Sequence, residues 1–160
     1  MVRAKKIKKR KVQSDLIYAD KLVGQLINLV MKDGKKELAS RLVYSALDQV
    51  KKKLKTDDPV QVFQQAVNNI KPNMEVRSRR VGGAAYQVPV PVRGSRKESL
   101  ALRWLVRAAR SHSNKDYHTY DKKLAAEIIE AYNKKGKAVE KKEETHRMAE
   151  ANKAFSHFRW

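Results

Sequence analysis

The chain has 160 residues and a net charge of +20, with 37 lysines and arginines against 17 aspartates and glutamates. So much like charge opposes compaction unless a polyanion neutralises it, which indicates a nucleic-acid partner. Cysteine is absent, which excludes disulfides and zinc–thiolate sites. The longest apolar run is only a few residues, and the start lacks the apolar segment of a secretory signal. We therefore expect a single-domain intracellular protein.

Residues 1–13 form a basic arm with seven cations and no acid. A block of like charge repels itself and is expected to stay extended until it meets an anion. Solubility alone would explain such a tail, but seven unopposed charges favour contacts with phosphates. The candidate phosphate-binding residues of the arm are Arg3, Lys5, Lys6, Lys8, Lys9, Arg10 and Lys11.

Apolar residues recur at helical spacing in three segments after the arm. The first covers about 20–32 and ends at the turn Asp33-Gly34, after which Lys35-Lys36 opens the second. The third begins at Asp58-Pro59, a cap followed by a first-turn proline, and Pro72 stops it. We interpret the three apolar stripes as core and assign no chemistry to them.

Residues 74–92 depart from the helical period and alternate on either side of a Gly-Gly pair, which predicts a β-hairpin. The register is decided by which face comes out apolar. A two-residue loop would pair Val76 with Pro89 and divide the apolar residues between both faces. We favour a three-residue loop beginning at Val81, because it opposes Val76 to Val88 and gathers the apolar residues on one face.

In that register the other face of the ribbon carries Arg77 and Arg79, with Arg80 near the tip. A two-stranded ribbon is marginal in water by itself, so this one needs a body to rest on. The prolines at 89 and 91 exclude its second strand from the interior of a larger sheet. The arginines could merely keep a solvated hairpin soluble, but the charge of the whole chain favours an arm that reaches phosphates.

A fourth helix is predicted from Ser95, which fits a capping box with Glu98. No acid follows Glu98 until Asp116, so cations on this helix lack the acidic partners that usually lie four positions away. Four of these cations fall within roughly 60° of one another at 100° per residue. This ridge is suited to an external anion, which arginine can bind with two hydrogen bonds. Its members are Arg96, Arg103, Arg107 and Arg110.

A fifth helix, closing near 133–136, buries Leu124 and Ile128, and a sixth follows over about 137–154. The sixth has few large apolar residues and is expected to lie over the surface. Residues 155–160 interleave aromatic and basic side chains, and these aromatics fit either docking on the body or stacking on bases. The pattern predicts a mainly α fold: a single domain of about six helices over residues 14–160, with a protruding two-stranded antiparallel β-ribbon between the third and fourth.

Catalytic signatures are missing from the chain. It has no P-loop, no G-x-G-x-x-G and no H-E-x-x-H, and its four histidines are scattered. We therefore expect neither an enzyme nor a bound cofactor or metal. A histone-like or other architectural nucleic-acid-binding protein would share the charge, but it would not need this ribbon and helix pattern.

Three long strings of the sequence are distinctive: residues 76–90, Ala101–Leu105 and His146–Phe155. They are similar to the bacterial form of the ribosomal small-subunit protein seven family. Residues 76–90 resemble the ribbon of that family nearly residue for residue. The resemblance covers about residues 14–160, with departures in the first dozen residues and at 111–121. Other matching strings are Gly34-Lys35-Lys36 followed by Leu42-Val43 and Ala46, and His157–Trp160.

The resemblance implies a structural constituent of the cytoplasmic small ribosomal subunit. It implies direct binding to the 3′ major domain of 16S rRNA, nucleation of head assembly, and a place at the subunit interface near the E-site tRNA. It also implies contacts with small-subunit proteins nine and eleven. The rRNA-facing residues carried over are Lys35, Lys36, Arg77, Arg79, Arg80, Arg96, Arg103 and Arg107, and the ribbon tip near the tRNA is Val81, Gly82, Gly83 and Ala84.

Overall fold

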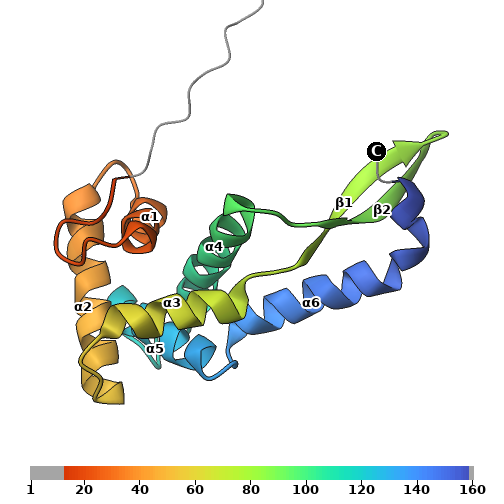
Figure 1. Cartoon of the computed structure of the whole chain (residues 1–160). Helices are drawn as coiled ribbons and strands as arrows, with labels where there is room; N and C mark the ends of the chain where they lie inside the picture. Colours follow the sequence, from red (N-terminus) through yellow and green to blue (C-terminus); the bar gives the residue numbers. More distant parts are fainter. Residues whose placement is uncertain (1–12, 159–160) are drawn as a thin grey trace, which may run out of the picture.

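The computed structural model describes residues 13–158, which form a helical body from which a β-ribbon projects (Figure 1). This confirms the mainly helical class with an antiparallel ribbon between the third and fourth helices. No helix in residues 13–158 is both long enough and apolar enough to cross a membrane. The elements are α1 (Lys21–Val30), α2 (Lys36–Leu54), α3 (Pro59–Ile70), β1 (Met74–Val81), β2 (Ala84–Pro91), α4 (Ser95–Ser111), α5 (Tyr120–Tyr132), α6 (Lys137–Ala151) and the 3-10 helix η1 (Lys153–Phe158).

Helix α5 is central to the body and packs against α2, α3 and α4. Its Leu124 and Ile128 are fully buried, as predicted. The apolar stripes of the first three helices also enter the core, where Phe63 is the largest fully buried side chain. In α2, Leu38 is 52% exposed although it is apolar, and the adjacent Ala39 is buried.

Two helices begin with side-chain caps, and α4 does not. Asp20 accepts the backbone N–H groups of residues 22 and 23 at the start of α1, and Asp58 caps α3 in the same way ahead of a first-turn proline. The capping box predicted at Ser95 and Glu98 is wrong, because the helix already includes Ser95 and its N-cap is Gly94. A glycine fits there because its φ is +54°.

The register predicted for the ribbon is also wrong. Val76 pairs with Pro89 and Arg79 with Tyr86, so the loop contains only Gly82 and Gly83. These glycines have φ values of 57° and 89°, and a type I′ turn requires positive φ at both central positions. Such a turn matches the twist of the two strands. In this ribbon the favourable two-residue turn determines the pairing, although a three-residue loop would place the apolar residues on one face.

The ribbon in fact buries apolar side chains on both of its faces. Val88 and Pro89 are neighbours on β2 and point to opposite faces, yet both are buried. Pairing places Arg77 opposite Val88 and Arg79 opposite Tyr86, on one and the same face. The two arginines therefore flank an apolar contact instead of forming a separate polar face.

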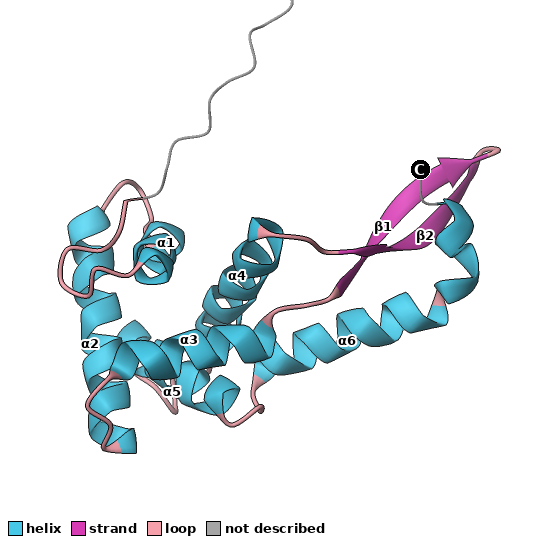
Figure 2. Cartoon of the chain, in the orientation of Figure 1, coloured by secondary structure: helices cyan, strands magenta, loops and turns pink. Residues whose placement is uncertain are grey.

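Helix α6 and η1 support the ribbon (Figure 1), and Figure 2 shows the strands set apart from the remaining helices. Contacts join α6 to β1 and η1 to β2. The ring centroid of Tyr86 lies 5.2 Å from those of both Phe155 and Phe158, so these two aromatics dock on the ribbon. The predicted sixth helix ran to residue 154, whereas α6 ends at Ala151 before η1 begins.

His146 ties α6 to the base of the ribbon. Its Nε2 accepts the backbone N–H of Asn73 at 3.0 Å, one residue before β1. Acceptance by Nε2 requires a neutral ring whose proton is on Nδ1. Burial lowers the pKa of His146 from its ordinary value, and the charge of Lys142 lowers it further. The structure thus favours the neutral form that this hydrogen bond needs.

We expect the free energy of unfolding to fall as pH drops below about 6.5, the ordinary pKa of histidine. Above that pH, His146 is neutral in both the folded and the unfolded state. Below it, the unfolded chain takes up the proton first, because the folded pKa is lowered. Thermal melts at several pH values should show a larger loss for the wild type than for His146→Gln, whose amide oxygen accepts the same hydrogen bond without titrating. Equal losses in both proteins would contradict this role.

Candidate nucleic-acid interface

The predicted arginine ridge is present on α4. Arg103, Arg107 and Arg110 are exposed, while Ala101 and Leu105 on the opposite side are fully buried. Arg103 donates to the backbone and hydroxyl oxygens of Ser99, and Arg110 donates to two carbonyls at the end of α1. These are neutral acceptors, so the charge of the ridge remains available to an external anion.

Two open hollows border the ridge. Arg103, Arg107 and Arg110 line one of about 250 Å³. Arg110 also lines the second, of about 350 Å³, together with Lys35 and the acid Asp33. Because Arg110 belongs to both hollows, the turn between α1 and α2 and the ridge on α4 form one basic surface.

Lys35 and Lys36 lie where α2 begins. Both are exposed, and Lys35 is the N-cap residue without a side-chain hydrogen bond to the helix. The positive end of the helix dipole adds to the charge of these lysines. This end of the surface therefore favours an anion such as phosphate.

Arg96 departs from the prediction that the ridge lacks internal partners. Its Nε and Nη2 donate to Oε2 of Glu75 at 2.8 and 2.7 Å. Arg77 contacts Oε1 of the same carboxylate, with Nε at 2.6 Å and Nη2 at 2.5 Å. Burial by itself would raise the pKa of Glu75, but the hydrogen bonds from Arg96 and Arg77 outweigh it and lower the pKa. Glu75 is therefore ionised, and the cluster links β1 to α4.

Sequence reasoning missed Glu75, although a signal for it was present. It is the only acid in residues 74–92 and lies two positions before Arg77. Side chains alternate along a strand, so residues two apart lie on the same face. Another missed contact is at the same joint, where Lys97 donates to the side-chain oxygen of Asn73 at 2.9 Å.

The ribbon tip lies far from the helical body (Figure 1). Gly82, Gly83 and Ala84 are exposed there, and Val81 is half-buried. Arg80 is exposed close to the tip. The other predicted cations lie in the basic arm, outside the residues that the structure describes: Arg3, Lys5, Lys6, Lys8, Lys9, Arg10 and Lys11.

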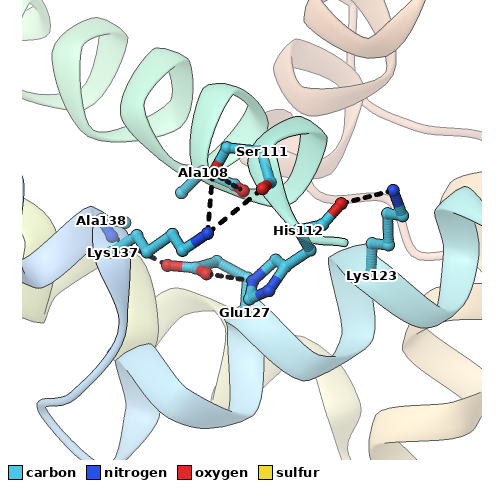
Figure 3. Close-up of polar contacts among 7 residues, drawn as sticks. All are labelled: Ala108, Ser111, His112, Lys123, Glu127, Lys137 and Ala138. Atoms are coloured by element: carbon cyan, nitrogen blue, oxygen red, sulfur yellow. Dashed lines mark hydrogen bonds and ion pairs between the residues drawn. The ribbon is translucent and has the colours of Figure 1, made fainter. Parts of the chain in front are cut away.

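A buried polar network joins α4, α5 and α6 (Figure 3). Glu127 is fully buried, with Oε2 at 2.6 Å from Nε2 of His112 and Oε1 accepting the backbone N–H of Ala138 at 2.8 Å. His112, Glu127 and Glu130 place ligand atoms within 4.8 Å of one another, as a metal site would. Both oxygens of Glu127 already have partners, however, so we interpret the network as a joint between helices.

A helical body that presents a basic ribbon and an arginine ridge has the architecture of a nucleic-acid-binding protein. Residues 2–153 match the family described as Ribosomal protein S7p/S5e. The chain is 53% identical over 159 residues to small ribosomal subunit protein uS7 of Thermotoga neapolitana, covering 99% of this chain and all of that protein. It is 52% identical over 160 residues to uS7 of Paracoccus denitrificans, covering both chains completely.

The chain belongs to the ribosomal protein S7p/S5e family. This confirms the resemblance inferred from the ribbon and the helix strings. The protein is a structural, non-enzymatic constituent of the small ribosomal subunit, where it associates with rRNA and serves translation. A histone-like protein would share the high positive charge of this chain but would not belong to this family.

Proposed function

We propose that the protein is a primary 16S rRNA-binding protein that nucleates assembly of the small-subunit head. In this proposal it binds the 3′ major domain, lies at the subunit interface near the E-site tRNA, and touches small-subunit proteins nine and eleven. The basic surface that α4 shares with the turn between α1 and α2 is the single observation that carries rRNA binding. Arg103 and Arg110 donate to neutral oxygens within the protein, and the exposed arginines line two open hollows.

The proposed interface has two parts with different tasks. The body surface and the base of the ribbon hold the rRNA backbone, because contacts with phosphates fix position and register. The tip, Val81 to Ala84, reaches beyond the body toward the E-site tRNA. The proposed rRNA contacts are the seven arm cations together with Lys35, Lys36, Arg77, Arg79, Arg80, Arg96, Arg103, Arg107 and Arg110.

Footprinting on 16S rRNA tests where the protein binds. The purified protein should protect nucleotides within the 3′ major domain, and a fragment of that domain should retain it better than duplex DNA does at equal salt. Protection confined to other domains would contradict the proposal. Equal retention on duplex DNA would instead indicate binding by charge alone.

Salt dependence tests how many cations contact phosphates. If the arm, the ribbon and α4 neutralise about 8–10 phosphates, the logarithm of affinity should fall against the logarithm of salt concentration with a slope of magnitude about 7–9. Titrations of the 3′ major-domain fragment at several potassium chloride concentrations measure this slope. A magnitude near 2 would mean that most of these cations face solvent in the complex.

A further inference from the structure

Glu75 is a buried acid within the surface proposed to bind RNA. It is 7% exposed, and the two arginines that contact it have side chains only 46% and 47% exposed. A negative charge within this surface repels phosphate, so attraction of phosphate does not explain why an acid lies there. Its contacts suggest a different role.

The carboxylate divides its two oxygens between two arginines from different elements. Oε1 accepts from Arg77 on β1 and Oε2 from Arg96 in the first turn of α4. Each guanidinium engages Glu75 along the edge made by Nε and Nη2. Its Nη1 end is not part of that contact. Because guanidinium donors form a rigid fork, an arginine held along one edge still presents donors along another.

The shared carboxylate has two favourable effects on this pair of neighbouring arginines: it offsets their repulsion and restricts their side chains. Their like charges repel each other, and the carboxylate between them offsets that repulsion. Each long side chain also loses rotamer freedom when it binds a phosphate. If Glu75 already fixes both side chains, less of that freedom is lost on binding, and affinity rises through preorganisation.

We infer that Glu75 positions Arg77 and Arg96 as a preformed clamp for the RNA backbone and fixes the base of the ribbon against α4. Glu75 is thus a positioning residue, and the two arginines make the phosphate contacts. The inference rests on the proposed rRNA-binding function and adds to it a residue that contributes by contacting other protein groups.

Glu75→Gln tests the clamp, because the clamp and net charge predict opposite changes in RNA affinity. One carboxylate oxygen becomes an amide nitrogen, a donor that faces an arginine donor, so one arm of the clamp is released. The net charge rises by one, and charge alone predicts tighter RNA binding. We instead expect affinity for the 3′ major-domain fragment to fall about tenfold at fixed salt. Binding as tight as wild type, or tighter, would overturn the clamp.

Glu98→Gln is the matched control. It also removes one negative charge near the start of α4, but Glu98 contacts Lys71 at 3.4 Å and lies outside the clamp. We expect it to bind RNA at least as tightly as wild type. If Glu98→Gln lost as much affinity as Glu75→Gln, the effect would belong to acids near α4 in general, which would overturn the clamp.

A second background separates positioning from folding. In Arg77→Gln/Arg96→Gln both guanidinium groups of the clamp are removed. Glu75→Gln should then cause no further loss of affinity. An equal loss in both backgrounds, with a parallel fall in melting temperature, would make Glu75 merely structural. Failure of the wild type to prefer the rRNA fragment over duplex DNA would overturn the proposed function, whereas failure of the Glu75→Gln prediction alone overturns only the clamp.

Discussion

Replacing Arg103, Arg107 and Arg110 together with alanine is expected to weaken binding to the 3′ major domain of 16S rRNA by about a hundred- to a thousandfold. Each charge-assisted hydrogen bond to a phosphate contributes about 1.5–3 kcal/mol, and only part of the sum survives as affinity. The slope of the salt dependence should also fall in magnitude by about 2–3. Filter-binding titrations at several salt concentrations measure both effects.

The stability of this variant must be measured beside its affinity. Arg110 donates to two carbonyls at the end of α1, so its loss should lower the free energy of unfolding by about 1 kcal/mol. Arg103 and Arg107 make no tertiary hydrogen bond within residues 13–158. Their removal should therefore leave the melt nearly unchanged.

Lys51, Lys52 and Lys53 provide a control of equal charge. They are exposed on the last turn of α2. Changing all three to alanine removes the same net charge, and we expect affinity to fall less than about threefold because exposed charges away from the interface are screened by salt. Equal losses in the two triple variants would mean that net charge, and not the surface on α4, determines binding.

The ridge on α4 could be predicted because it depends only on the helical period. Residues at 103, 107 and 110 share a face of any helix that contains them, whatever packs on its other side. The period also separates Ala101 and Leu105 from the ridge, and both are buried. The hollows beside the ridge could not be predicted, since they arise where α1 and α2 meet α4 in the folded chain.

The predicted ribbon register is wrong because it assumes that only one face of the ribbon is covered, whereas both faces bury apolar side chains. Val88 and Pro89 are both buried, so apolar residues on both faces are satisfied and the search for a single apolar face no longer discriminates between registers. The Gly82-Gly83 turn then decides the pairing. Support by α6 and η1 depends on chain more than 45 residues further on, which no local pattern around the ribbon reveals.

The partner of Arg96 was missed for a related reason. The prediction for α4 considers only acids four positions away on the same helix, where ion pairs of isolated helices form. Glu75 instead lies 21 residues earlier, on β1. Its position beside Arg77 on one strand face was readable from the sequence, but its contact with α4 depends on how the ribbon leaves the body.

Shortening the ribbon while keeping its Gly-Gly turn is expected to separate rRNA binding from E-site function. Deleting Arg80, Val81, Ala84 and Ala85 removes two residues from each strand, so the alternation of ladder pairs is preserved and Arg79 and Tyr86 flank the turn. The ribbon becomes about 7 Å shorter. The rings that dock on Tyr86 remain, so the shortened ribbon should keep its support.

Affinity of this variant for the rRNA fragment should fall less than about tenfold, since one arginine is lost while the surface on α4 is intact. Retention of deacylated tRNA in the E site of reconstituted subunits should be lost, because the proposed E-site function depends on how far the tip reaches. Arg80→Ala at full ribbon length is the matched control and should lose the same small part of rRNA affinity while retaining the tRNA. If the shortened ribbon abolished rRNA binding and spared E-site occupancy, the tip and the body surface would not divide the two tasks in this way.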